Sequence, residues 1–160
     1  MPRHEEGFSL IELLIVIAII LVITAIAIPS LLRSRMAANQ ASAVQSLRVL
    51  GSSEVAYSST YGMGFSATLS MLGPPPPGSL ASASSAGLID DLLASGHKSG
   101  YDFVYNPALS AAGQYYGYTI YANPSQVGIT GREFYYTDQS HVIRMNTASQ
   151  AGSTDSSIAQ

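Results

Sequence analysis

The stretch Phe8–Ile28, FSLIELLIVIAIILVITAIAI, decides the fold of this chain. It holds 21 residues, and a helix of that length is roughly 30 Å long, which matches the hydrocarbon core of a bilayer. No face of this helix would be polar, so the stretch indicates a membrane span or a buried bundle helix. The apolar part of a secretory signal peptide is shorter, about 7–15 residues, and its cleavage site follows the apolar run.

One acid, Glu12, interrupts the apolar run close to its start. A carboxylate in the middle of a membrane costs about 2.5–3.5 kcal/mol on insertion scales, and less near the interface. Two interpretations remain open. Glu12 either reaches water at the headgroups or waits for a cation. Because no Lys or Arg lies within one helical turn, that cation would come from another molecule or from an amino terminus newly created nearby.

Composition excludes several classes of protein. The chain has 160 residues, enough for one domain and an extra segment. Only 11% of the residues are charged and the net charge is −3, so no nucleic-acid partner is predicted. The absence of cysteine excludes disulfides, thiolate catalysis and cysteine zinc sites. Arg3 lies before the span and Arg33 and Arg35 follow it, so counting basic residues leaves the topology open.

The segment from Gly7 to about Arg35, with GFSLIE followed by a long apolar run and Pro29, resembles the prepilin signal. That signal is shared by type IV pilins and by the pseudopilins of type II secretion systems. The resemblance implies that a membrane peptidase cuts after Gly7 on the cytoplasmic side and N-methylates Phe8. It also implies that Glu12 attracts the amino terminus of a neighbouring subunit, and that the body of the protein lies outside the cytoplasm.

By this resemblance the chain is a structural subunit, not an enzyme, and needs no cofactor. It would rest in the bacterial inner membrane as a single-pass precursor and then polymerise as a homo-oligomeric helical filament. Its partners would be the prepilin peptidase and methyltransferase and the pilus or secretion assembly machinery. The filament would be an extracellular pilus or, as the alternative, a periplasmic pseudopilus. A membrane-anchored binding or enzymatic domain is the remote alternative.

Two features depart from the family pattern. The leader ends in Glu5 and Glu6 where family leaders are usually basic, and the span contains no glycine. Pro29 matches the family's proline near the end of the apolar run. A proline within a helix removes one backbone hydrogen bond, so Pro29 is expected to kink the helix, unless it starts a second one.

Helical periodicity continues after Pro29 to about Thr60. The apolar positions fall on one stripe, interrupted by Gln40 and Glu54, which predicts an amphipathic helix with one face on a sheet. Gly51 is expected to weaken this helix locally. The residues of the stripe are Met36, Ala43, Leu47, Leu50 and Tyr57.

The remainder reads as a head with strands. The stretch from Gly64 to about Gly87, which contains prolines 74–77, is predicted to be a surface loop. GLIDDLLASGH (87–97) predicts a short helix with Leu88, Leu92 and Leu93 inward and Gly96 as its C-cap. Alternating segments at 101–105, 115–122, 133–136 and 142–145 predict four mostly antiparallel strands, with a hairpin turn at TDQSH (137–141). The last two strands would flank this turn, and its type is left open because family members commonly have glycine where His141 stands.

We therefore expect an α+β, pilin-like fold in which a long N-terminal helix, half membrane and half amphipathic, packs on a roughly four-stranded antiparallel sheet. Asp90, Asp91 and His97 could be imagined as metal ligands, but their spacing matches no metal motif, and no catalytic motif is present. We predict neither a metal site nor a catalytic residue. The expected segments are a leader (1–7), a span (8–28), an amphipathic helix (29–61), a head (62–145) and a polar tail (146–160) that is mobile or wraps the head.

Overall fold

The computed structural model describes residues 7–109 and 114–158. The chain divides into two compact units, residues 1–35 and 36–160. Helix α1 (Leu10–Tyr61) has 52 residues, and residues of both units belong to it. In the first unit, the large apolar side chains of α1 are exposed. Pro29 lies inside α1, so it does not start a second helix.

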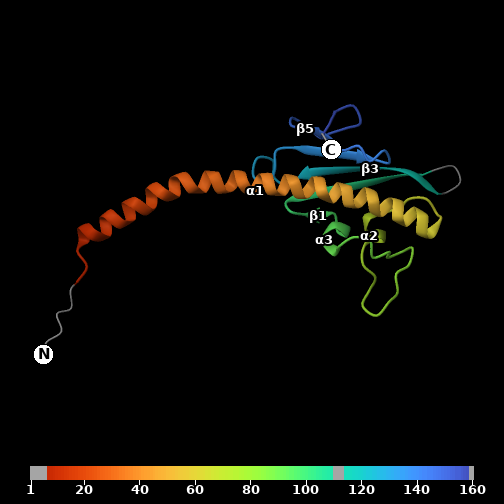
Figure 1. Cartoon of the computed structure of the whole chain (residues 1–160), viewed down its shortest axis with the longest axis horizontal. Coiled ribbons are helices and arrows are strands. Elements are labelled where there is room, and N and C mark those ends of the chain that lie inside the picture. Colours follow the sequence, from red (N-terminus) through yellow and green to blue (C-terminus); the bar gives the residue numbers. More distant parts are fainter. Residues whose placement is uncertain (1–6, 110–113, 159–160) are drawn as a thin grey trace. The chain divides into compact units, whose positions relative to one another are not determined.

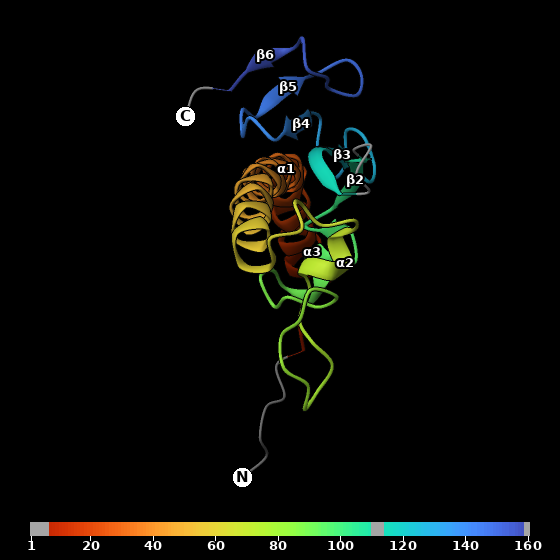
Figure 2. The same cartoon turned by 90° about the vertical axis from the view of Figure 1, so that its right-hand side faces the viewer.

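The second unit is an α+β head in which α1 packs on an antiparallel sheet (Figure 1). Every strand pairs with the next one along the chain. Figure 2 shows the end strands β5 and β6 on one side of α1 and the helices α2 and α3 on the other. The elements after α1 are α2 (Leu69–Leu72), α3 (Asp91–Ala94), β1 (His97–Lys98), β2 (Tyr101–Leu109), β3 (Tyr115–Pro124), β4 (Phe134–Asp138), β5 (Arg144–Asn146) and β6 (Ser156–Ser157).

The core lies between α1 and the middle strands. The predicted stripe of α1 forms one side of it, although Met36 at its start is only half-buried. Alternate residues of β2 and β3 face the stripe, as the pleat of a strand requires. The fully buried members include Ala43, Leu47, Leu50 and Tyr57 from α1, Tyr101 from β2, and Tyr118, Ile120 and Ala122 from β3.

The sheet has six strands, so the prediction of four was wrong in number. The two strands that were missed, β1 and β6, have two residues each. Such short edges carry no alternation that a pattern search can detect. Strand β6 lies within the tail, whose residues 156–157 pair with β5. The last predicted strand, 142–145, is displaced, because β5 begins at Arg144.

Two local predictions for the head also differ from the structure. Helix α2 lies within the segment expected to be a loop, and its Leu69 and Leu72 are buried. Helix α3 has only four residues, and Leu92 and Leu93 point in directions about 100° apart on it. Leu93 is buried and Leu92 is 63% exposed. The C-cap is Ser95, and Gly96 follows it with a φ of 81°.

The turn after β4 contains the residue whose conformation the sequence left open. β4 extends to Asp138, and the backbone N–H of His141 donates to the carbonyl oxygen of Asp138 at 2.9 Å. His141 takes a φ of 60°, the left-handed conformation that glycine adopts more easily. Its ring packs over Gly51 of α1, where a Cβ atom would lie 3.1 Å from His141 Cδ2. The glycine in the helix therefore leaves room for this turn.

Candidate functional site

The start of α1 forms the first candidate site. Helix α1 begins at Leu10, and the backbone N–H of Leu13 donates to the carbonyl oxygen of Ser9. Glu12 Oε2 accepts a hydrogen bond of 2.9 Å from the backbone N–H of Ser9. A glutamate three residues after the first cap residue commonly reaches back in this way, as half of a capping box. Glu12 therefore has a donor within its own chain.

Sequence reasoning missed this role of Glu12 because it considered water and cations as partners, and not the backbone of its own helix. The signal was present as Ser9-Leu10-Ile11-Glu12, the serine and glutamate spacing of a capping box. The backbone donor is neutral, and the Glu12 side chain remains exposed. The hydrogen bond holds the acid at the helix start, where the helix dipole also favours a negative charge.

The expected cleavage position lies immediately before this helix. Gly7 and Phe8 are outside α1, and the Phe8 side chain is 78% exposed. Nothing lies within 4 Å of the place where a Cβ atom on Gly7 would be. The peptide bond between them is thus neither helical nor covered by other described residues. Residues 1–6 of the leader, with Arg3, Glu5 and Glu6, lie outside the described part.

The span that follows has the length and composition to cross a membrane. None of its most apolar window is buried within the structure. The hydroxyl of Thr24 donates to the carbonyl oxygens of Ile20 and Leu21, both at 3.0 Å. Such back-bonding satisfies a hydroxyl inside an apolar segment. The exposed apolar surface of this segment calls for an apolar environment from lipid or from other subunits.

A second acid of α1, Glu54, is buried in the head. Its carboxylate accepts hydrogen bonds from Ser66, from the backbone N–H at 2.9 Å and from Oγ at 2.6 Å. The hydroxyl of Tyr105 donates to the carbonyl oxygen of Ser66 at 2.8 Å. Burial raises the pKa of Glu54, and the two bonds from Ser66 oppose that rise. Burial also raises the pKa of Tyr105, with the Glu54 charge as the second cause.

This cluster ties α1 to the segment that follows it and to β2. The donors come from the protein itself and the carboxylate is fully covered, so no substrate reaches it. We interpret the cluster as structural. From the sequence Glu54 was visible only as an interruption of the apolar stripe, because one polar residue on a core face does not reveal a partner 12 residues away.

Two of the three imagined metal ligands have separate partners, and Asp91 has no side-chain partner among the described residues. Asp90 caps α3 by accepting from the backbone N–H of Leu93 at 3.0 Å, and it pairs with Lys98. His97 Nδ1 lies 2.6 Å from the carboxylate of Asp102. Lys98, followed by the hydrogen bond from Leu93, holds the pKa of Asp90 below its usual value. Within residues 7–109 and 114–158, no three His, Asp or Glu side chains converge as a metal site would require.

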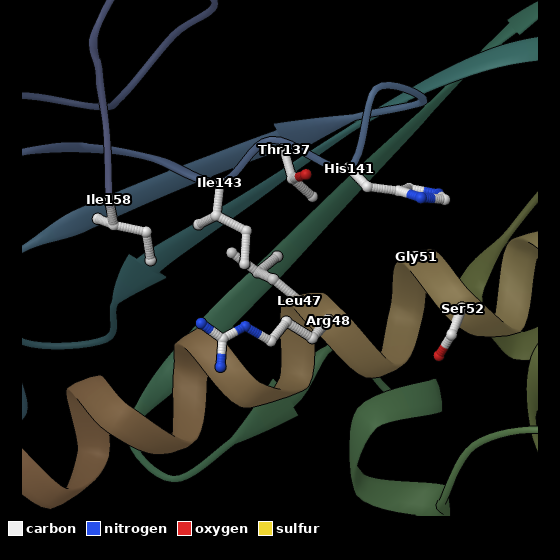
Figure 3. Close-up of a pocket in the computed structure, with 8 residues that line it drawn as sticks. All are labelled: Leu47, Arg48, Gly51, Ser52, Thr137, His141, Ile143 and Ile158. Carbon is white, nitrogen blue, oxygen red and sulfur yellow. The ribbon is translucent and has the colours of Figure 1, made fainter. Parts of the chain in front are cut away.

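A groove of about 390 Å³ lies between α1 and the β4–β5 side of the head. Figure 3 shows Leu47 and Arg48 entering it from α1, while Ile143 and Ile158 point toward it from the sheet side. Thr137 and His141 complete that side. The groove combines an apolar lining with one permanent cation, the guanidinium of Arg48 (Figure 3). It lies wholly within the head unit.

In the comparison with known proteins, a family motif matches the segment that contains the first candidate site, the start of α1. Residues 2–28 match the prokaryotic N-terminal methylation motif. This motif is the one found at the amino terminus of prokaryotic pilins. The match covers the expected cleavage position, Glu12 and the span.

A relative in Thermus thermophilus, the type IV wide pilus major component PilA4, is 60% identical over 37 residues. The aligned stretch is 23% of this chain and 28% of the relative, so it spans under a third of the relative's length. No solved structure matches the chain. The similarity to this relative thus concerns less than a quarter of the chain.

Proposed function

We propose that this chain is a structural subunit of a type IV pilus-like filament, assembled through its N-terminal helix. The observation that carries the proposal is a methylation motif on an apolar helix whose most apolar window is left unburied by the described residues. Such a helix is satisfied first by a bilayer and then by the same helices of neighbouring subunits. The precursor would cross the inner membrane once with its amino end in the cytoplasm, and the assembled filament would be extracellular.

Processing by a prepilin peptidase, with cleavage between Gly7 and Phe8 and N-methylation of Phe8, follows from this proposal. Cleavage converts Phe8 into a new amino terminus that carries a positive charge. On meeting Glu12 of a neighbouring subunit, this cation would replace or join the neutral N–H of Ser9. Hydrogen bonds between ionised groups are roughly twice as strong as neutral ones. Assembly is therefore an exchange of partners at Glu12, driven by charge.

The choice between pilus and pseudopilus rests on a single indication. The motif is shared by both kinds of filament, and the name of the Thermus relative describes a wide pilus. We therefore favour a pilus, with a pseudopilus of a type II secretion system as the alternative. Electron microscopy of sheared cell-surface material distinguishes long extracellular fibres from a short periplasmic assembly.

The decisive experiment is to determine the amino terminus of the purified protein. Mass spectrometry is expected to find N-methylated Phe8 as the first residue of chains in sheared fibres. Gly7→Val serves as the matched control, because a bulky side chain at the cut is expected to leave the full-length precursor in the membrane. Recovery of wild-type protein that still starts at Met1 would overturn the proposal.

Substitutions of Glu12 test the exchange of partners. Glu12→Gln keeps an oxygen that can accept from Ser9 but removes the charge, whereas Glu12→Val removes both. We expect both variants to insert into the membrane and to lose at least about tenfold in fibre yield, since a charge-assisted bond is lost in each. Normal fibres from both would refute the pairing. Fibres from Glu12→Gln alone would show that capping, and not charge, is what assembly needs.

A further inference from the structure

The groove beside α1 has chemistry that the head itself does not use. Arg48 is exposed, and its guanidinium makes no ion pair or hydrogen bond with any residue in the described ranges. The apolar wall beside it is formed by Leu47, Ile143 and Ile158. A site of this kind fits a ligand with an anionic group next to an aliphatic one.

The same head carries a matching group elsewhere on its surface. On α3, Asp91 and Leu92 are adjacent and both exposed, Leu92 at 63%. The carboxylate of Asp91 makes no ion pair or side-chain hydrogen bond within the described residues, unlike its neighbour Asp90. Among the described head residues, no other exposed acid directly adjoins an exposed large aliphatic side chain.

We propose that the groove receives α3 of a second copy of this chain. In this contact the carboxylate of Asp91 pairs with the guanidinium of Arg48, and the Leu92 side chain lies on the apolar wall. A cavity of about 150 Å³ holds a benzene-sized group, so the 390 Å³ of the groove can hold both side chains. Leu92 would thereby leave water, which favours association.

The two surfaces of this contact are different patches of one molecule. A contact between different patches is heterologous, and when its rotation does not close it generates an open helical filament. Each subunit would offer α3 to one neighbour and its groove to another. This inference rests on the proposed filament and adds a contact between heads to the assembly of the N-terminal helices.

Charge reversal tests the ion pair in fibres made from the full chain. Arg48→Glu alone and Asp91→Arg alone each place like charges together, so each is expected to lower fibre yield about tenfold or more. The two substitutions together restore opposite charges and should return the yield to within about twofold of wild type. Normal yield from either single variant, or no rescue by the double variant, would overturn the docking.

Folding of the variants is monitored separately, because both residues are exposed. Each variant is expected to keep the protease resistance of the wild-type head in the membrane fraction. If wild-type chains form no fibres, the proposed function itself fails, and with it the docking. If wild-type chains form fibres and the single charge-reversal variants form them with the same yield, only the docking fails.

The absence of cysteine makes crosslinking a direct second test. Ser52 lines the groove, and Ser95 lies one turn after Leu92, so Ser52→Cys with Ser95→Cys leaves the proposed contact intact. A short bis-maleimide reagent added to fibres of this variant is expected to give a ladder of covalent oligomers. Ser52→Cys with Ser79→Cys, in the proline-rich loop, is the matched control and should give none. Fibres that yield no ladder, or an equal ladder from the control, would overturn the docking.

Discussion

The two parts of α1 obey different rules although they belong to one helix. In the first unit Ile17 is 49% exposed, and its apolar neighbours are exposed on every side of the helix. In the head, by contrast, Leu50 is fully buried and only one stripe is apolar. A helix that is apolar all round needs an apolar environment from outside, whereas an amphipathic helix stabilises its own domain. The sequence of α1 thus separates a part that needs an apolar environment from outside from a part that folds the head.

The two acids of α1 differ in the same way. Glu12 is exposed and accepts one hydrogen bond, from its neighbour Ser9, so its charge stays accessible to another molecule. Glu54 is fully buried and accepts two hydrogen bonds from Ser66, so its carboxyl group is inaccessible to other molecules. We propose that one carboxylate serves contact between subunits while the other fixes the loop after α1.

The largest expected effect comes from truncating one leucine of the head. Leu50→Ala removes a fully buried side chain from the core and should lower the free energy of unfolding by about 3 kcal/mol. Ile17→Ala is the matched truncation in the span and should change head stability by less than about 0.5 kcal/mol. Denaturant unfolding of the full chain in detergent micelles, followed by near-ultraviolet circular dichroism of the tyrosines, measures both.

In fibre assembly the order of the two variants should be reversed, with Ile17→Ala showing the larger effect. Ile17→Ala removes surface that we assign to contacts between subunits, so it should weaken fibres while leaving the head intact. An equal loss of head stability from Ile17→Ala would break the comparison, because it would show that the span contributes to the folding of the head.

The next effect is a pH dependence that Glu54 confers on the head. Burial raises the pKa of Glu54 above its usual value of 4.5, so the folded head holds this proton more tightly than the unfolded chain does. The contribution is fully present below pH 4.5 and is lost as the pH rises toward the raised pKa of the folded state. Glu54→Gln resembles the protonated acid and should remove this loss.

The measurement is the difference in unfolding free energy between wild type and Glu54→Gln across pH 4 to 8. Asp90 and Asp138 have lowered pKa values, so their contributions to the pH dependence of stability have the opposite sign. These contributions are the same in both chains and cancel in the difference. The unfolding free energy of Glu54→Gln should increase relative to that of wild type as the pH rises. A difference that stays constant over this range would show that Glu54 titrates as it does in the unfolded chain.

The comparison also explains how much of the fold could be predicted from the sequence. Long periodic segments were predictable, because the span, the stripe of α1 and the strands β2, β3 and β4 repeat a pattern over several residues. The edges β1 and β6 and the one-turn helix α2 were not, since two to four residues carry no period. Leu92 was placed inward because a periodic helix was assumed where only one turn forms.

The candidate sites divide along the same line. The methylation motif lies in one contiguous segment, residues 2–28, so it can be recognised directly in the sequence. The bond from Ser9 to Glu12 was also local and followed from a known spacing, yet it was overlooked because only water and cations were considered as partners. The groove joins α1 to residues 137–158, about 90 positions further along the chain, and depends on a left-handed His141. No spacing rule brings such distant residues together.

The smallest expected effect is a difference in unfolding free energy between alanine variants of two adjacent acids, Asp90 and Asp91. Asp90→Ala removes the hydrogen bond to the N–H of Leu93 and should lower the unfolding free energy by about 1 kcal/mol, as is usual for an N-cap. Asp91→Ala removes an exposed acid without side-chain partners among the described residues and should cost less than about 0.5 kcal/mol. Chemical denaturation of the two variants under identical conditions gives the comparison.

Fibre yield should reverse that order, because Asp91 is assigned to the contact between heads and Asp90 to the fold. Asp91→Ala should therefore reduce fibres with an almost unchanged head, while Asp90→Ala should lower stability and leave fibres near wild type below the melting temperature. If both variants lose fibres in proportion to stability, the two acids act only through α3 itself. The separation of assembly from folding along α1 would then not extend to the surface of the head.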